Sequence, residues 1–348
     1  MASAAAIRPF SRLENDVTGI DITFAIAAYN AAPFIEAAIG SVLSQTVSSV
    51  EIIVVDDEST DSTVDIVRRL MAQTDRLRLI QSTRNSGPAA SRNKALSAAR
   101  GTWLAVVDAD DLVLPERSRH LLDLAQSTGA DIVADNVERF QDLSGQSLST
   151  ILQTCCQPYC FLIDAATYLQ HNTMFSTEIT LGYLKPMFRT SFLRKHRLTY
   201  SEELWIGEDY DFCLRCLLAG ARYVVTSGCF YRYRVRDGSL SWRLKLADTQ
   251  RLIAAHHKVM AQCPNQGGSF NRAADSYVEG LERARDFAAL VDSLKEHRWR
   301  DAANSILARI DLVPILGGSL YAHVSKKLAR FMESRGCDAQ GRNLHLYL

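Results

Sequence analysis

Acidic side chains follow two short apolar segments that are typical of buried strands. Asp57 closes the first segment, and Asp108 and Asp110 follow the second. Because alternate residues leaving a strand point the same way, the carboxylates of Asp108 and Asp110 can face one pocket. Carboxylate oxygens suit Mg²⁺ or Mn²⁺, which proteins hold with one or two acids and substrate phosphates. The spacing fits a metal-bridged diphosphate, although Asp-x-Asp alone is a common sequence.

A third acidic pair, Glu208-Asp209, stands directly before an apolar helical pattern and shortly after Trp205. Acids at a helix start are favoured by the helix dipole. One of them could instead act as a general base at the mouth of the helix. Periodicity alone leaves these two interpretations open.

Arginines stand at alternate positions in Arg232, Arg234 and Arg236. On an extended strand this spacing places them on one face, and guanidinium groups match phosphate geometry. An exposed edge strand kept soluble by charge would show the same pattern. In a chain without net charge, this concentration predicts that at least one arginine faces an anion.

The elements that must position these groups alternate along the first hundred residues. Apolar runs predict strands over 22–28, 50–55, 77–80 and 103–107. Helices are predicted between them, over 33–43 and 89–99. A further helix is expected to be capped by Ser59 or Thr60 and to continue to Leu70. Such alternation predicts a mostly parallel sheet with helices on both faces. Ligands bind at the carboxyl ends of such strands, where Asn30, Asp57 and Asp108 would meet. We therefore favour a binding site there over a set of helix caps.

The pattern becomes entirely helical after residue 245, over 244–262, 270–297 and 299–309. We expect a loose leader over 1–20, an α/β domain over 21–245 and a helical appendage over 246–348. Within the appendage, a basic amphipathic stretch over 321–332 is either a helix at a membrane interface or an ordinary surface helix.

Composition excludes several classes of protein. The 348 residues carry 39 basic and 39 acidic side chains and are 47% hydrophobic. These values exclude a disordered chain and argue against a nucleic-acid-binding protein. No apolar run is long enough to cross a membrane, and the first residues are not expected to be a secretory signal. The eight cysteines, including Cys213 and Cys216 in a helical pattern, are expected to be reduced structural thiols in a cytoplasmic protein.

Taken in order, five motifs resemble those of the family 2 glycosyltransferases, which have the GT-A fold. They are Ala28-Tyr29-Asn30, Val54-Val55-Asp56-Asp57, Asn85-Ser86-Gly87 with Ser91-Arg92-Asn93, Asp108-Ala109-Asp110-Asp111, and Gly207-Glu208-Asp209. Each motif is modest alone, but five in order over about 190 residues are specific. The resemblance leaves the helical tail unexplained.

The resemblance implies an inverting transfer of a sugar from a nucleotide diphosphate donor, usually a UDP-sugar. By this resemblance, Asp57 would recognise the uracil, Ala28 and Asn30 would line the nucleotide pocket, and Arg92 would help to close it. Asp108 would lie near the ribose or the sugar, and Asp110 near the metal and the diphosphate. Asp209 would be the catalytic base. A rival is a sugar-nucleotide-binding protein without catalysis, which would need no base. A Rossmann dehydrogenase fits poorly, because no Gly-x-Gly-x-x-Gly follows the first strand.

The sequence departs from the family at Arg236. Many relatives place a histidine there, three residues before Ser-x-Ser, here Ser239 and Ser241. Arginine is not a metal ligand. Either Asp110 is the only protein ligand of a Mg²⁺ or Mn²⁺ ion, or Arg236 supplies charge to the diphosphate instead.

Over its whole length the chain most resembles bacterial exopolysaccharide glucosyltransferases of the succinoglycan type. This resemblance implies β-linked glucose from UDP-glucose and a lipid-linked glycan acceptor at the cytoplasmic face of the inner membrane. Another UDP-sugar or a lipopolysaccharide acceptor remains an alternative. Trp205, Glu208 and Trp242 are candidates for acceptor contacts, although the two tryptophans could equally pack the core.

Overall fold

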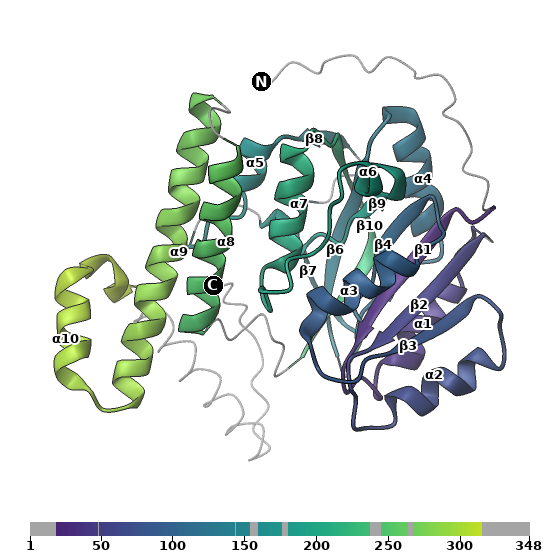
Figure 1. Cartoon of the computed structure of the whole chain (residues 1–348), viewed down its shortest axis with the longest axis horizontal. Coiled ribbons are helices and arrows are strands. Elements are labelled where there is room, and N and C mark those ends of the chain that lie inside the picture. The colour runs from purple at the N-terminus through teal and green to yellow at the C-terminus, as the bar shows by residue number, and fades with distance from the viewer. Residues whose placement is uncertain are drawn as a thin grey trace.

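The amino-terminal apolar runs form neighbouring parallel strands of one central sheet. The computed structural model describes residues 19–314, apart from 48, 143, 154–158, 176–179, 237–244 and 264–266. Its first strands are β1 (Ile22–Ala28), β2 (Val50–Asp56), β3 (Leu77–Gln81) and β4 (Trp103–Val106). Strand β1 pairs in parallel with both β2 and β4, and β2 pairs in parallel with β3. Their carboxyl ends therefore lie along one edge, which positions the predicted site (Figure 1).

The second half of the sheet is mixed. Its strands are β5 (Leu112–Val113), β6 (Ile132–Gln141), β7 (Ser147–Thr150), β8 (Cys160–Ile163), β9 (Met187–Arg189) and β10 (Tyr223–Val235). The order across the sheet is β3-β2-β1-β4-β9-β6-β10-β5, with β7 beside β6 and β8 beside β10. Strand β9 runs antiparallel between β4 and β6, and β6 and β10 are parallel. The predicted mixed, mostly parallel α/β sheet is confirmed.

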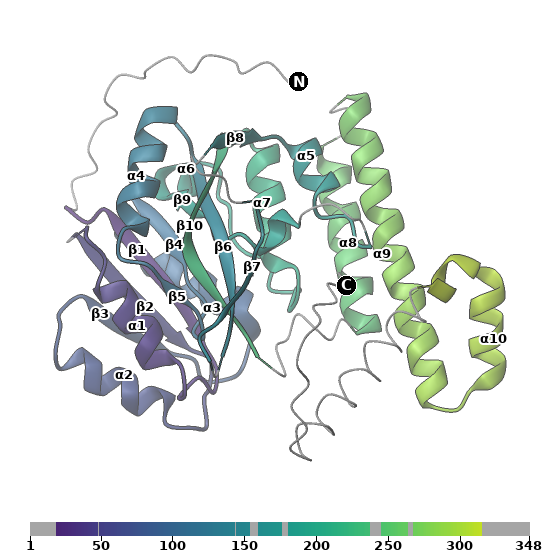
Figure 2. The ribbon, with the colours of Figure 1, turned by 180° about the vertical axis from the view of Figure 1, so that it is seen from behind.

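Helices cover both faces of this sheet. They are α1 (Ile35–Leu43), α2 (Thr63–Met71), α3 (Gly87–Ala98), α4 (Arg117–Thr128), α5 (Ala165–Gln170), α6 (Thr190–Lys195) and α7 (Glu208–Leu218), with a 3-10 turn η1 (Leu181–Tyr183). Helices α3, α6 and α7 lie in front of the sheet in Figure 1, whereas α1 and α4 lie in front in Figure 2. The two helices that carry Arg92 and Asp209 thus share one face.

The cap predicted for α2 at Ser59 or Thr60 is wrong. The helix begins at Thr63, after Ser62, whose side chain makes no capping bond. Asp61 lies outside the helix, where its carboxylate accepts hydrogen bonds from both the main-chain N–H and the hydroxyl of Thr63. The residues between β2 and α2 instead form a turn that contacts the end of β1.

The carboxyl-terminal helices pack on α7. They are α8 (Leu246–Gln262), α9 (Gly268–Lys295) and α10 (Trp299–Ala308), followed by a 3-10 turn η3 (Ile310–Leu312). Helix α8 lies between α7 and α9, and α10 is outermost (Figures 1 and 2). Leu252, Val259 and Tyr277 belong to the same hydrophobic cluster as the sheet, while Leu290 and Ala302 help form a separate small cluster. The main core therefore continues across residue 245 into α8 and the first part of α9.

Among the described residues, no helix combines the length and apolar character needed to cross a membrane.

Candidate active site

Asp57, predicted to recognise the base of the nucleotide, is buried at the end of β2. Its side chain follows β2 and is 3% exposed. Oδ2 accepts hydrogen bonds from the main-chain N–H groups of Ser86 at 3.0 Å and Gly87 at 2.7 Å, at the start of α3. The buried Oδ1 has no hydrogen-bond partner within the described part of the chain. An unsatisfied buried carboxylate oxygen is costly, so this atom is suited to accept a hydrogen bond from a ligand.

Ala28 and Asn30 lie beside Asp57 at the end of β1. The main-chain N–H of Asp57 donates to the carbonyl of Ala28 at 2.8 Å. Asn30 adopts a left-handed conformation with φ of 48°, which asparagine tolerates better than most residues. Its side-chain oxygen accepts from the N–H of Thr60 at 2.8 Å. The pocket edge is therefore built from two strand ends that are cross-linked through their turns.

The central feature of the site is a cluster of three acids and two cations. Arg92, on α3, contacts Asp108 at 3.0 Å and Asp209 at 2.9 Å, and it also donates to Glu208. Lys185, just before β9, contacts Asp108 at 2.8 Å and Asp209 at 3.0 Å through its Nζ. The structure thus joins the acid after β4 to the acid pair at the start of α7.

Charge pairing within the cluster decides the ionisation of its members. Burial by itself would raise the pKa of Asp108, but Lys185 and Arg92 outweigh it and lower that pKa to about 2. Burial likewise opposes the charge of Lys185, yet Asp108 and Asp209 raise the pKa of Lys185 above its usual range. Burial raises the pKa of Glu208 despite the opposing effect of Arg92. Asp108 and both cations are therefore charged at neutral pH.

Asp110, the predicted metal ligand, lies at the exposed edge of this cluster. Its Oδ2 accepts a hydrogen bond from Arg236 at 2.8 Å. Burial and the neighbouring Asp108 raise the pKa of Asp110, and Arg236 opposes that shift. The described residues contain no group of three or more histidine, cysteine or acidic side chains that could hold a metal ion. One Asp110 oxygen would be the protein's contribution to a metal that is completed by a diphosphate and water.

Asp111 supports the loop rather than facing the cluster. It is buried, and its carboxylate accepts from the hydroxyl of Tyr231 at 2.7 Å and from the N–H of Arg234 at 2.8 Å. The hydroxyl of Tyr231 in turn accepts from the N–H of Asp108 at 3.2 Å. Burial, together with Asp108 and Asp110, raises the pKa of Asp111 well above its usual range. Strand β10 thereby fixes the position of the Asp-x-Asp loop.

Each of the three alternating arginines forms an ion pair with a carboxylate. Arg232 contacts Glu138 at 2.6 Å, Arg234 contacts Asp142 at 2.7 Å, and Arg236 contacts Asp110. Arg234 and Arg236 also lie over the ring of Phe34, so these two share a face, as the spacing predicts. Arg236 is the one that pairs with the carboxylate of Asp110, while the side chain of Arg234 also donates to the main-chain carbonyl of Asp110 at 2.6 Å.

Comparisons with known proteins identify the family of the chain. The sequence model described as "Glycosyl transferase family 2" matches residues 23–192. The "Succinoglycan biosynthesis protein ExoO" of Rhizobium meliloti (strain 1021) is 35% identical over 312 residues, which cover 90% of this chain and 88% of that relative. The chain belongs to glycosyl transferase family 2.

Solved structures show the same fold for this glycosyltransferase. S. aureus TarS 1-349 in complex with UDP-GlcNAc aligns with a TM-score of 0.58 and 17% identity, covering 84% of this chain and 92% of that one. The mannosyltransferase PcManGT from Pyrobaculum calidifontis, in complex with GDP-Man and Mn²⁺, aligns with a TM-score of 0.54 and 18% identity, covering 94% and 86%. The predicted GT-A fold is therefore confirmed.

In this glycosyltransferase, Trp205 lies against Gly87 at the start of α3 and three positions before Glu208. The residue is 43% exposed, and a Cβ added to Gly87 would lie 3.3 Å from its ring. Gly87 also has φ of +86°, so a side chain at position 87 would be strained and would press on the ring. Glu208 is buried on Arg92 instead of facing outward. Trp242, Ser239 and Ser241 lie outside the described residues, as does the basic stretch 321–332.

The thiols of the Cys-x-x-Cys sequence are buried in α7. Cys213 and Cys216 are both free cysteines. Burial, with a smaller contribution from Asp209, raises the pKa of Cys213 to about 12. A thiol with so high a pKa is a poor nucleophile and metal ligand, which agrees with the structural role expected for this pair.

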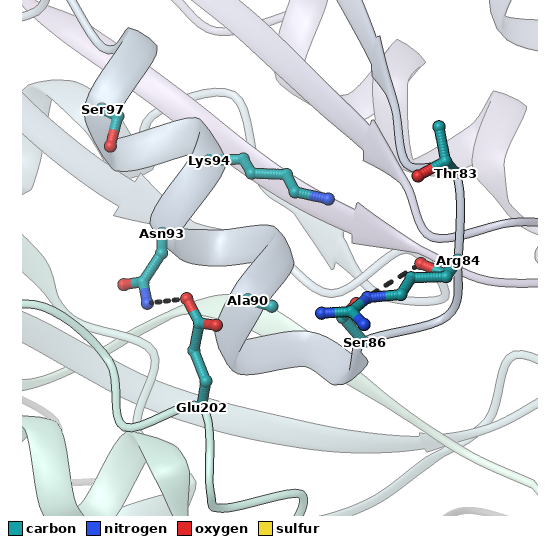
Figure 3. A pocket seen from close by; sticks show the side chains of 8 residues that line it. All are labelled: Thr83, Arg84, Ser86, Ala90, Asn93, Lys94, Ser97 and Glu202. Carbon is teal, nitrogen blue, oxygen red and sulfur yellow. Dashed lines mark hydrogen bonds between the residues drawn. The ribbon is translucent and has the colours of Figure 1, made fainter.

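An open polar hollow of about 530 Å³ lies on the outer side of α3 (Figure 3). Its lining residues are Thr83, Arg84, Ser86, Ala90, Asn93, Lys94, Ser97 and Glu202. Asn93 donates to Glu202 at 2.9 Å, and Lys94 donates to Ser82 at 2.6 Å. Helical spacing turns Arg92 away from the side of α3 that carries Ser86, Asn93 and Ser97. The hollow therefore contributes none of the charged groups of the acid cluster.

The sequence motifs predict that Asp108, Asp209 and Arg92 belong to one site, but they do not include Lys185. The available clue was a single lysine within the otherwise apolar run Leu184-Lys185-Pro186-Met187-Phe188. A buried lysine needs a partner, and that requirement points to nearby carboxylates. The identity of those carboxylates depends on strand pairing, which the sequence did not provide.

Proposed function

We propose that the protein is an inverting glycosyltransferase that moves a sugar from a UDP-sugar to an acceptor hydroxyl, with Asp209 as general base. The observation that carries this proposal is the linkage of Asp209 to Asp108 through shared cations. The proposed base, Asp209, therefore lies close to Asp108. By the family resemblance, Asp108 lies near the donor. The Asp209 side chain is 19% exposed, so an acceptor can reach it.

The unsatisfied oxygen of Asp57 supports a uracil base in the pocket. Uracil carries one ring N–H, which would donate to Asp57 Oδ1 while Oδ2 stays on the start of α3. Recognition by a fixed buried acceptor discriminates strongly, because a base lacking the donor leaves the acceptor unpaired. Ala28 and Asn30 would line the pocket beside it.

The chemical step moves one proton and exchanges one bond. Asp209 takes the proton of the acceptor hydroxyl, and the acceptor oxygen forms a bond to the anomeric carbon. The bond from that carbon to the β-phosphate oxygen breaks, and its electron pair leaves with UDP. Attack from the face opposite the leaving group inverts the anomeric centre. A positioned base of this kind contributes about 10²- to 10⁴-fold to the rate.

Charge that develops on the leaving UDP needs stabilisation. Asp110 would hold a Mg²⁺ or Mn²⁺ ion through one carboxylate oxygen, as the ion needs few protein ligands when a diphosphate is present. Such an ion, when bound, neutralises the diphosphate. Arg236 is bonded to Asp110 and would lie against the same phosphates, so it adds a second positive group there.

We further propose that the transferred sugar is glucose in β linkage, and that the acceptor is a lipid-linked glycan in bacterial exopolysaccharide synthesis. The similarity to a succinoglycan biosynthesis protein over most of both chains supports this assignment. The enzyme would then work at the cytoplasmic face of the inner membrane as a peripheral protein.

The test is a panel of UDP-sugars offered to the purified protein, with UDP release measured with and without membrane lipid extract as acceptor. We expect UDP-glucose to be preferred and lipid extract to increase UDP release. Preference for another UDP-sugar would overturn the glucose assignment alone. UDP binding without turnover of any donor would make the protein a binding module and overturn the catalytic proposal.

A further inference from the structure

The function proposed above rests on the cations that Asp108 and Asp209 share, but it assigns no role in the reaction to Lys185, which contacts both acids. We propose that Lys185 is a positioning residue that holds the carboxylate of Asp209, together with Arg92, in the orientation needed for proton transfer. This inference rests on the proposed function, because it assigns the base to Asp209. Four features of the structure carry it.

The first feature is the strand pairing that brings Lys185 to the site. Met187, at the start of β9, pairs with Ala105 of β4 in antiparallel register. The residues before Met187 therefore run alongside the residues after Ala105, which lead to Asp108. This register places Lys185 next to Asp108 although 77 positions separate them along the chain.

The second feature is a rigid support for the main chain at Lys185. Arg117, at the start of α4, is 1% exposed and donates to the carbonyl of Lys185. Its Nε also donates to Asp135 of β6 at 2.9 Å, and its guanidinium lies over the ring of Tyr231. A buried arginine held on three sides fixes the point from which the lysine side chain extends.

The third feature is the way the two cations divide the oxygens of Asp209. Arg92 contacts Oδ1 at 2.9 Å, and Lys185 contacts Oδ2 at 3.0 Å. A carboxylate bonded at one oxygen can still turn about that bond, whereas contacts at both oxygens fix its plane. Each oxygen accepts more than one hydrogen bond, so the acceptor hydroxyl can still donate to Asp209.

The fourth feature is the balance of charge. Asp108, Glu208 and Asp209 bring three carboxylates together, and Arg92 alone would leave two of them without a counter-charge. Buried unpaired carboxylates are strongly disfavoured. The Lys185 side chain is 9% exposed, so solvent screens its two contacts very little. Lys185 therefore allows Asp209 to stand beside Asp108 in this arrangement.

The test compares Lys185→Met and Lys185→Arg with wild type, using the UDP-sugar that wild type turns over best. Lys94→Met is a matched control, because Lys94 lies on the outer side of α3 and bonds Ser82 instead of the acid cluster. The measurements are kcat and KM for the donor, the Kd of UDP by calorimetry, and the melting temperature of each variant.

We expect Lys185→Met to lower kcat about 10- to 100-fold, the loss typical of a reacting group displaced by about 1 Å. The Kd of UDP should change less than about threefold, because Asp57 does not contact Lys185. Lys185→Arg should recover part of kcat, since it keeps the charge with a different geometry. Lys94→Met should keep wild-type kcat.

Several outcomes would overturn the inference. Wild-type kcat in Lys185→Met would do so, as would a raised donor KM at unchanged kcat, which would make Lys185 a donor-binding residue. If Lys185→Met does not fold, Lys185→Arg decides: a lowered kcat at unchanged UDP affinity supports the inference, and wild-type kcat contradicts it. Absence of turnover by wild type with every donor would instead overturn the proposed function, and the inference with it.

Discussion

Asp108 and Asp209 are bound by the same two cations, with one oxygen of each carboxylate on Arg92 and the other on Lys185. The four groups come from α3, the end of β4, the segment before β9 and the start of α7. Such a closed arrangement fixes the distance between Asp108 and Asp209. It also ties together the two halves of the sheet at their shared edge.

Replacing the proposed base should separate catalysis from binding. Asp209→Asn keeps the size of the side chain but removes its ability to accept a proton, so we expect kcat to fall about 10²- to 10⁴-fold. The Kd of UDP should stay within about threefold of wild type. Asp211→Asn is a suitable control, because Asp211 lies two positions further along α7 and pairs with Arg215. Full turnover by Asp209→Asn would remove Asp209 as the base.

The free oxygen of Asp57 predicts a preference for uracil over cytosine. Cytosine presents an acceptor where uracil presents a donor, so CDP would place two acceptors together. We expect wild type to bind UDP at least about 10-fold more tightly than CDP, which corresponds to one unsatisfied hydrogen bond. Asp57→Asn should narrow this ratio, because an amide can donate to cytosine. Equal binding of UDP and CDP by wild type, measured by calorimetry, would exclude the assigned uracil contact.

Removal of divalent metal should lower turnover. Asp110 offers one carboxylate oxygen, so the ion would be held weakly and exchange readily with a chelator. We expect UDP release to fall at least about 10-fold in EDTA and to return with Mg²⁺ or Mn²⁺. The Asp110→Asn variant should need a higher metal concentration for half-maximal rate. Undiminished turnover in EDTA would assign the neutralising role to Arg236 instead.

Gly207, directly before α7, lies close to Leu252 of α8. It has φ of +79°, and a Cβ there would lie 2.5 Å from Cδ2 of Leu252. Gly207→Ala should therefore destabilise the fold by about 1–2 kcal/mol for the left-handed conformation and about 1–3 kcal/mol for the clash. Gly220→Ala has the same backbone requirement, with φ of +90°, but no atom within 4 Å of its Cβ. Urea unfolding should show a clearly larger loss for Gly207→Ala, and equal losses would refute the contact with α8.

His256 should make stability depend on pH. Burial, with a smaller effect of His257, lowers its pKa from 6.5 to about 4. In the unfolded chain the ring gains a proton near pH 6.5, while the folded chain resists protonation until about pH 4. Its contribution to stability is therefore present above pH 6.5 and is lost as the pH falls towards 4, by about 1.4 kcal/mol for each pKa unit.

The matched comparison for this pH effect is His256→Phe. The phenyl ring can retain the contact of His256 with Tyr277, whose ring centroid lies 4.9 Å away. As the pH falls from 6.5 to 4.5, the unfolding free energy of wild type should decrease more than that of His256→Phe. A difference that does not change with pH would show that His256 is not buried in its neutral form.

The strands β1 to β4 could be predicted from sequence because each is a short apolar run that ends in polar residues. Parallel pairing then places Asp57 and Asp108 at one edge for any sheet of this type, whichever strands are neighbours. The cap of α2 could not be predicted in the same way, since Ser59, Thr60 and Ser62 are equally suitable residues. Contacts with the end of β1 decide which of them precedes the helix.

The amino-acid sequence by itself determined the fold class and the family, and it supplied the candidate site residues, because local patterns and ordered motifs carry that information. Only the tertiary structure decided that Arg92 and Lys185 bind Asp108 and Asp209 together, and that α8 packs on Gly207. The position of Lys185 depends on the antiparallel pairing of β9 with β4 and β6. Long-range strand pairing of this kind is fixed by packing of the whole sheet, and no short segment of the chain encodes it.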